Sequence, residues 1–143
     1  SSSSAPAVAT SAALNSAYLY VGGSSTILTY RLNGTTSPAF VSNTASAGAL
    51  SSLAADSKGT YLYGVDGTGA LNRYVTFAGG VPALDWQAQF GPGGNSIAVD
   101  PTGTCVVMAG SSSVRSFRIS SAGLTLFTTL NPPSPTAVLI ASY

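Results

Sequence analysis

The segment SLAADSKGTYLYG (Ser52 to Gly64) has a close counterpart 44 residues further along, SIAVDPTGTCVVM (Ser96 to Met108). Both segments contain the frame S-(apolar)-A-x-D-x-x-G-T. Asp in the first position and Gly in the fourth position of the D-x-x-G step are typical of a type I turn. Alternating apolar residues on both sides of that step favour β-strands. The frame therefore predicts a strand, a tight turn and a second strand, in a unit that recurs.

The frame belongs to a longer unit, which occurs three times. The units are AYLYVGGSSTILTYRLNGTT from Ala17, TYLYGVDGTGALNRYVTFAGG from Thr60 and TCVVMAGSSSVRSFRISSAG from Thr104. One position of the unit, spaced by 43 and then 44 residues, is held by Tyr18, Tyr61 and Cys105. A period in the forties, filled with short alternating apolar runs, indicates the blades of a β-propeller.

Each unit divides into four expected strands, rich in β-branched and aromatic residues and separated by Gly, Pro and Asn. First strands, which carry the frame, are expected at Ser52 to Ala55 and Ser96 to Val99. The remaining strands are expected at Tyr18 to Val21, Tyr61 to Val65 and Cys105 to Ala109 (second), Ile27 to Leu32, Leu71 to Phe77 and Val114 to Ile119 (third), and Pro38 to Ser42, Ala83 to Phe90 and Leu124 to Leu130 (fourth). No segment has a useful helical period. The predicted fold class is all-β, with about three propeller blades of four antiparallel strands.

The chain divides into two expected parts. Residues 1–16 are rich in Ser and Ala and are predicted to be a flexible N-terminal segment. Residues 17–143 are predicted to form a partial propeller, with repeats at about 17–59, 60–103 and 104–143. A further first strand is expected within TAVLIASY (Thr136 to Tyr143), at Ala137 to Ala141.

The segments LYVGG, LYGVDGTGAL and SIAVDPTGT resemble the repeats of lactonase-type seven-bladed propellers, also described as YVTN-repeat propellers. SVRSFRISSAG (Ser113 to Gly123) and TILTYRLNG (Thr26 to Gly34) are similar to the second half of that repeat. The resemblance covers Ala17 to Tyr143. It implies the propeller fold and, in active members, hydrolysis of a sugar lactone by Arg and acidic or His residues at one mouth of the channel. This chain has no His and no Glu, so that site cannot be carried over residue by residue.

Three blades do not close a ring, since closed propellers have four to eight. The expected strand order begins at a second strand (Tyr18) and ends at a first strand (Ala137 to Ala141). A C-terminal strand of one chain is therefore expected to complete the opening blade of another copy, by strand addition between subunits. The alternative is that the missing blades belong to a longer chain.

Composition limits the classes of partner. Charged residues make up 6% of the chain, hydrophobic residues 45%, and the net charge is +1, which gives no electrostatic basis for binding nucleic acid. No apolar run approaches the roughly 18 residues of a membrane span, and no membrane insertion is expected. A surface of Ser, Thr, Asn and Gly is typical of secreted or cell-surface proteins, so an extracytoplasmic location is predicted. Cys105 is the single cysteine, which precludes an internal disulfide.

Candidate catalytic groups are few. A His-based triad and a zinc site of the usual kind both need residues that the chain lacks; no metal or cofactor is expected. The turn formers are predicted to be Asp56 with Gly59 and Asp100 with Gly103, and Asp66 is interpreted as part of an Asp-Gly hairpin turn. Asp85 has no such explanation.

Several other side chains are candidates for binding or structural roles. Trp86, beside Asp85, is a candidate to stack on a sugar or partner or, alternatively, to cover a blade edge. Arg31 and Arg118 hold equivalent positions and are expected to bond a neighbouring blade's carbonyls or a ligand, while Arg73 and Arg115 are expected to face solvent. Cys105 is expected to be a small buried hydrophobe. Asn33, in the sequon NGT, is a candidate for glycosylation.

The sequence therefore predicts a non-catalytic, extracytoplasmic propeller module that serves as a structural or protein-interaction scaffold and self-associates through open blade edges. Two alternatives remain: a fragment of a lactonase-like hydrolase whose catalytic residues lie outside this chain, and a carbohydrate-binding propeller that uses Trp86. Extension of the reading frame, glycan binding and the mass of the native assembly separate these hypotheses.

Overall fold

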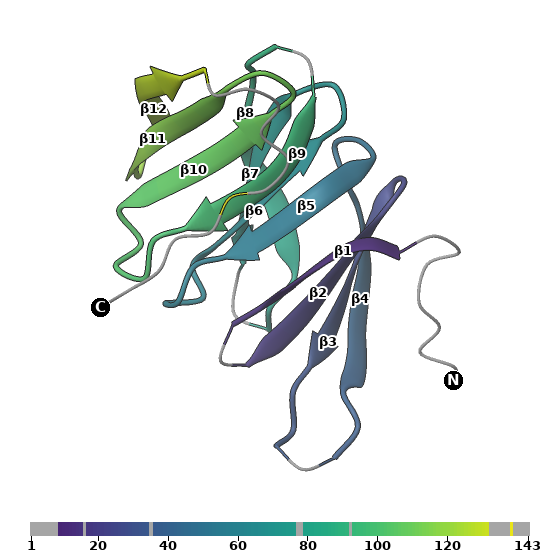
Figure 1. Ribbon diagram of the computed structural model, residues 1–143. Helices are drawn as coiled ribbons and strands as arrows, with labels where there is room; N and C mark the ends of the chain where they lie inside the picture. The colour runs from purple at the N-terminus through teal and green to yellow at the C-terminus, as the bar shows by residue number, and fades with distance from the viewer. Residues whose placement is uncertain are drawn as a thin grey trace.

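The computed structural model describes residues 9–15, 17–34, 36–76, 79–91, 93–131 and 138. These residues form twelve strands and no helix, and the strands are grouped in three antiparallel sheets of four (Figure 1). The predicted all-β blades are confirmed. Among the described residues no helix is long and apolar enough to cross a membrane.

Each sheet is one blade, and its strands follow one another along the chain. Blade 1 consists of β1 (Ala9–Leu14), β2 (Tyr18–Gly23), β3 (Thr26–Arg31) and β4 (Ala39–Ala45). Blade 2 consists of β5 (Leu50–Ala55), β6 (Tyr61–Asp66), β7 (Ala70–Thr76) and β8 (Pro82–Gln89). Blade 3 consists of β9 (Gly94–Val99), β10 (Cys105–Gly110), β11 (Val114–Ser120) and β12 (Gly123–Leu130).

The first strands of the blades lie next to one another, with β5 between β1 and β9 (Figure 1). This is the arrangement of inner strands around a propeller axis. Each blade packs face to face on the next, because alternation along a strand gives both faces of the sheet apolar side chains. The blade 1–blade 2 core includes Tyr20, Leu53 and Leu62, and the blade 2–blade 3 core includes Tyr63, Met108 and Phe117.

Blade 1 differs from the sequence-based expectation at its first strand. Residues 9–14, which were assigned to the flexible N-terminal segment, form β1 and pair with β2 along its length. Asn15 ends this strand, and its Oδ1 accepts hydrogen bonds from the N–H groups of Ala17 (2.9 Å) and Tyr18 (2.8 Å). The first blade therefore has its own inner strand, and the expectation that it begins at Tyr18 and needs one from another copy was wrong.

A β-bulge recurs between the third and fourth strands of every blade. The strand register shifts between Thr29 and Tyr30 in blade 1, between Arg73 and Tyr74 in blade 2, and between Ser116 and Phe117 in blade 3. The residues skipped on the fourth strands are Val41, Asp85 and Phe127. A bulge re-aims the extra side chain and bends the strand, so these three residues share one special position in the repeat.

The inner strands are also joined by a repeated serine contact. Ser52 Oγ of β5 accepts a hydrogen bond from Ile97 N of β9 at 3.3 Å. Ser96 Oγ of β9 accepts one from Val138 N, also at 3.3 Å. Val138 therefore lies beside β9 as Ile97 lies beside β5; the rest of the strand predicted at Ala137 to Ala141 lies outside the described residues.

Candidate functional site

One region of blades 1 and 2 receives the following blade, and we call this region, and its counterpart in blade 3, the socket. It consists of the start of the second strand, the end of the third strand and the bulged fourth strand, on the face toward the next blade. The backbone at its base repeats: a residue at, or one position from, the end of the third strand donates a hydrogen bond to a carbonyl just before the second strand. These bonds are Leu32 N to Ala17 O, Thr76 N to Thr60 O and Ile119 N to Thr104 O, at 2.8, 3.0 and 2.9 Å.

The socket of blade 2 contains a buried arginine. Arg73 on β7 is 1% exposed and forms an ion pair with Asp85, with 2.5 Å between Nη2 and Oδ2 and 2.7 Å between Nε and the same oxygen. Its guanidinium also lies 4.4 Å from the ring centroid of Tyr61. The prediction that Arg73 faces solvent was wrong, because blade 3 covers the face of β7 on which it lies.

The turn between β11 and β12 of blade 3 fills this socket. Arg73 Nη1 donates to Ser120 O at 2.5 Å and to Gly123 O at 3.4 Å, and Nη2 donates to Ser121 O at 3.0 Å. Hydrogen bonds from a charged donor are stronger than neutral ones. Arg73 therefore performs the task that was expected of Arg31 and Arg118: it binds the carbonyls of a neighbouring blade.

Asp85 and Trp86, the two candidate ligand-binding residues, both lie at this inter-blade contact. The bulge places the carboxylate of Asp85 on the side of Arg73, and its side chain is 27% exposed. Trp86 is half-buried, stacks on Phe90 with ring centroids 6.4 Å apart, and covers Gly123. A Cβ atom at Gly123 would lie 2.5 Å from Cδ1 of Trp86, and φ of Gly123 is +144°. Only glycine fits this approach without rearrangement.

The socket of blade 1 is filled in a related way. Tyr18, at the start of β2, covers Gly80, which lies in the connection between β7 and β8 of blade 2. A Cβ atom at Gly80 would lie 2.5 Å from Cδ1 of Tyr18, and φ of Gly80 is +79°. Both inter-blade contacts of the chain therefore seat a glycine of the third-to-fourth-strand connection under an aromatic ring of the preceding blade.

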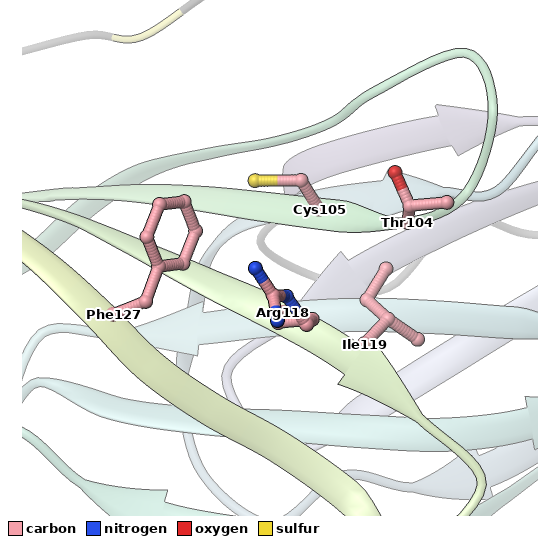
Figure 2. A pocket seen from close by; sticks show the side chains of 5 residues that line it. All are labelled: Thr104, Cys105, Arg118, Ile119 and Phe127. Carbon is pink, nitrogen blue, oxygen red and sulfur yellow. The ribbon is translucent and has the colours of Figure 1, made fainter.

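The socket of blade 3 is open and forms a cavity of about 470 Å³. Figure 2 shows its lining side chains, which come from β10, β11 and β12 and the residue before β10: Thr104, Cys105, Arg118, Ile119 and Phe127. Phe127 occupies the bulge position and is 56% exposed. The guanidinium of Arg118 lies 5.9 Å from the centroid of its ring.

Cys105 is the half-buried member of this socket. Burial, and then the charge of Asp100, raise the pKa of its thiol above the ordinary value. A raised pKa keeps the sulfur protonated and poorly nucleophilic at neutral pH. Cys105 was expected to be a small buried hydrophobe; it is only half-buried and lines the open socket, but the raised pKa of its thiol agrees with an unreactive role.

The frame aspartates lie in the turns that lead into the second strands. The carbonyls of Asp56 and Asp100 accept hydrogen bonds from Gly59 N (3.2 Å) and Gly103 N (2.9 Å), and both glycines have positive φ, +71° and +72°. Burial raises the pKa of the Asp100 carboxyl, whereas hydrogen bonds from Thr102, Cys105 and Thr104 lower it. The hydrogen bonds have the larger combined effect, so the pKa of Asp100 lies below its ordinary value. An ionised carboxylate that accepts four hydrogen bonds is well suited to hold a turn.

The remaining candidates are spread over the molecule. Arg31 is exposed, Arg115 is half-buried, and Asn33 is exposed in the connection after β3, so its glycosylation stays a prediction. Asp66 is buried, and its Oδ1 accepts hydrogen bonds from Thr68 N (2.9 Å), Thr68 Oγ1 (2.6 Å) and Ala70 N (3.0 Å) within the hairpin after β6. Within the described ranges, no three His, Cys, Asp or Glu side chains gather as metal ligands would.

The socket was not predicted from the sequence. Four of the residues that lie around the sockets of blades 2 and 3 were singled out, but not as parts of one site. Asp85, Trp86, Arg118 and Cys105 were each weighed alone. The repeat alignment shows only that the bulge position held by Asp85 in blade 2 is held by Phe127 in blade 3.

No family model matches the sequence, and no curated protein matches it at a significant level. Solved structures do match. The periplasmic gluconolactonase of Pseudomonas aeruginosa matches with a TM-score of 0.71 at 17% identity, over 83% of this chain and 38% of its own. A protein from Lactobacillus plantarum matches with a TM-score of 0.73 at 18% identity, over 88% of this chain and 42% of its own. Hydrazine synthase of Kuenenia stuttgartiensis matches with a TM-score of 0.75 at 10% identity, over 90% of this chain and 38% of its own.

The chain thus spans about two fifths of the length of these structures. Proteins with different named activities share its fold, and a fold alone does not assign an activity. The chain has the fold of three successive blades of a β-propeller, the fold that it shares with lactonase-like propeller structures.

Proposed function

We propose that the chain is a non-catalytic, extracytoplasmic propeller module that acts as a protein-interaction scaffold and self-associates through its open blade faces. The observation that carries this proposal is the unfilled socket of blade 3. The same part of blades 1 and 2 holds a turn of the next blade, whereas in blade 3 it exposes Phe127 and Arg118. Burying such surface in a partner is the favourable outcome in water.

The scaffold role is also supported by what the candidate residues do. Trp86 covers Gly123 of blade 3, Asp85 pairs with the arginine that binds the carbonyls of blade 3, and Asp56 and Asp100 hold turns. An extracytoplasmic location agrees with the polar, weakly charged composition and with one structural neighbour that is a periplasmic protein.

A fragment of a lactonase-like hydrolase is the second candidate, favoured by the neighbour that is named a gluconolactonase. In that case the acidic and basic groups of the site would come from blades outside this chain. The purified chain would then not hydrolyse a sugar lactone, and a longer product of the same reading frame would.

Light scattering coupled to size-exclusion chromatography tests the proposal at micromolar concentration. Self-association predicts a mass at least twice that of one chain, which decreases on dilution. A monodisperse monomer at all concentrations would contradict it. Lactone hydrolysis by a longer product of the same reading frame, with none in the fractions of this chain, would instead favour the second candidate.

A further inference from the structure

The two contacts between blades differ in how their enclosed polar groups are satisfied. We propose that the contact between blades 1 and 2 is the seam of the molecule, at which blade 1 separates from blade 2 by local opening while blades 2 and 3 stay joined. Both contacts lie between described blades. The difference between them therefore depends neither on self-association nor on what precedes blade 1 or follows blade 3 in a longer chain.

The contact between blades 1 and 2 encloses polar side chains without hydrogen-bond partners. Thr29 on β3 and Asn72 on β7 are 0% exposed, and the hydroxyl of Thr29 and both amide atoms of Asn72 are unpartnered within the described part of the chain. The buried Oγ of Ser42, opposite Thr29 on β4, is unpartnered too. Thr29 lies opposite Tyr20, and Asn72 lies two residues before Tyr74, on the same face of β7. Both tyrosines belong to the core between blades 1 and 2.

The equivalent positions in the contact between blades 2 and 3 are occupied differently. The guanidinium of Arg73 is bonded to Asp85 and to carbonyls of blade 3, and Arg115 is half-buried. The equivalent Tyr20 and Tyr63 both have a buried, unpartnered hydroxyl, so they do not distinguish the contacts. The pairs of equivalent residues that do are Thr29 and Arg73, Ser42 and Trp86, and Asn72 and Arg115.

Direct hydrogen bonds also join blades 2 and 3 at several levels. Near the bulge, Arg73 donates to three carbonyls of blade 3. Between the frame turns, Ser57 Oγ donates to Pro101 O at 2.8 Å, and between the inner strands Ile97 N donates to Ser52 Oγ at 3.3 Å. Separation of these blades would break the bonds of a charged donor, which are stronger than neutral ones.

The connections between the blades differ in the same direction. The connection between β4 and β5 is SAGA, at residues 46–49, and Ala47 N donates to Tyr74 Oη at 3.2 Å. Phe90, which directly follows β8, instead packs its ring on Phe117 of blade 3, with centroids 4.7 Å apart. A short run of small residues is suited to absorb the backbone rotation of a hinge, whereas Phe90 anchors its connection to the next blade.

Opening therefore has different consequences at the two contacts. At the seam, water would satisfy the three unpartnered side chains, which offsets part of the cost of exposing the apolar core. Between blades 2 and 3, water would only replace bonds that Arg73 already makes. Local opening occurs where its free energy is lowest. Blade 1 is thus the part that separates, with residues 46–49 as the hinge, and its separation exposes the apolar face of blade 2 that includes Leu53 and Leu62.

Thiol labelling under native conditions tests the seam with a matched pair of buried positions. Ile27 and Leu71 hold equivalent positions on the third strands, are both 0% exposed, and have isomeric side chains. Ile27 belongs to the core between blades 1 and 2, and Leu71 to the core between blades 2 and 3. In a Cys105→Ala background, Ile27→Cys should react with N-ethylmaleimide at least tenfold faster than Leu71→Cys. Equal rates, or faster reaction of Leu71→Cys, would overturn the proposal.

A second pair repeats the comparison at the inner strands, and it decides if a variant of the first pair does not fold. Leu53 and Ile97 hold equivalent positions on β5 and β9 and are both 6% exposed. Leu53→Cys probes the seam, and Ile97→Cys probes the contact between blades 2 and 3. The same tenfold ratio is expected in the Cys105→Ala background, with near-ultraviolet circular dichroism to identify folded variants. A ratio near one contradicts the seam.

Thr29→Val separates the proposed cause from ordinary differences in packing. Added to Leu53→Cys, it should slow labelling threefold or more, because opening no longer hydrates an unpartnered hydroxyl. Added to Ile97→Cys, it should leave the rate unchanged. An unchanged or faster rate at residue 53 would refute the role of the unpartnered groups. Equal slowing at residues 53 and 97 would show that only global unfolding exposes them, which also refutes the seam.

Discussion

The contact between blades 1 and 2 and the contact between blades 2 and 3 use the same register position with opposite chemistry. Thr29 pairs with Tyr20 and Ser42 in blade 1, and Arg73 pairs with Tyr63 and Trp86 in blade 2. Arg73 satisfies its donors with Asp85 and three carbonyls of blade 3. Thr29 is also fully buried, but its hydroxyl has no hydrogen-bond partner among the described residues, and neither has that of Ser42.

The comparison shows that the strand arrangement determines where two blades pack together. The side chain at this one register position determines which interactions stabilise the contact. A buried ion pair with further hydrogen bonds contributes geometric specificity, and removing one partner is strongly destabilising. A buried hydroxyl without a partner costs free energy instead. Substitutions at these matched positions should therefore have effects of different size and even of opposite sign.

The largest effect is expected for Asp85→Ala. Removal of the carboxylate leaves the guanidinium of Arg73, which is 1% exposed, without its counter-ion, and the free energy of unfolding should fall by about 3 kcal/mol. Urea unfolding followed by tryptophan fluorescence measures it. Adding Arg73→Met should recover part of the loss, and the exposed Arg31→Met is the control, expected within about 0.5 kcal/mol of wild type. Equal losses in Asp85→Ala and Arg31→Met would refute the role of the ion pair.

The glycines under aromatic rings should come next. Gly123→Ala and Gly80→Ala bring a methyl group to 2.5 Å from Trp86 and Tyr18 at positive φ, so each should lose about 2 to 3 kcal/mol of stability. Gly103→Ala is the control for Gly80→Ala, since its φ of +72° is close to the +79° of Gly80 but its Cβ position is open, and it should lose only about 1 kcal/mol. Thermal unfolding compares the three variants. Equal losses would show that backbone strain alone matters, not the ring contact.

A smaller effect, of opposite sign, is expected for Thr29→Val. Replacing the buried, unpartnered hydroxyl by a methyl group removes an unsatisfied polar atom at nearly constant volume. The variant should be unchanged or more stable by up to about 1 kcal/mol in urea unfolding. A clear destabilisation would mean that the hydroxyl has a partner, such as a buried water.

The smallest effect concerns the Asp100 turn and pH. Because the pKa of Asp100 is lower in the folded chain, its ionised form stabilises the fold above the unfolded pKa of about 3.9. That contribution should be lost as the pH falls through the lower folded pKa. Carbon-13 NMR of the carboxyl should show a midpoint below 3.9, and Asp100→Asn should flatten the acid side of the stability profile. A midpoint at or above 3.9 contradicts the hydrogen-bond assignment.

The fold was largely predictable from the repeat, because strand alternation and turn chemistry recur with one period. β1 escaped detection for a local reason. Asn15 stands where the later units have Asp56 and Asp100, and the turn that follows is shorter, so the frame is not visible in the first unit. Its strand is also made mostly of Ala, Ser and Thr, which carry no apolar alternation.

The inter-blade chemistry was not predictable from one sequence. Alternation places Arg73 on a face of β7, but it does not reveal that a turn 47 to 50 residues later covers that face. Asp85 reaches Arg73 through a bulge, and a bulge has no fixed sequence signature. Binding of a neighbouring blade's carbonyls by an arginine was predicted correctly, but the prediction named Arg31 and Arg118, whereas Arg73 makes these bonds.

The most direct test of association through the open socket of blade 3 compares the mass of the Phe127→Ser variant with that of the unmodified chain. Phe127 is 56% exposed in that socket, and replacing its benzyl side chain by a hydroxymethyl group removes apolar surface that a partner would bury. Light scattering at one concentration should show assembly of the unmodified chain and a lower mass for Phe127→Ser. An unmodified chain that is monomeric, or a variant that assembles as well as the unmodified chain, would contradict the proposal.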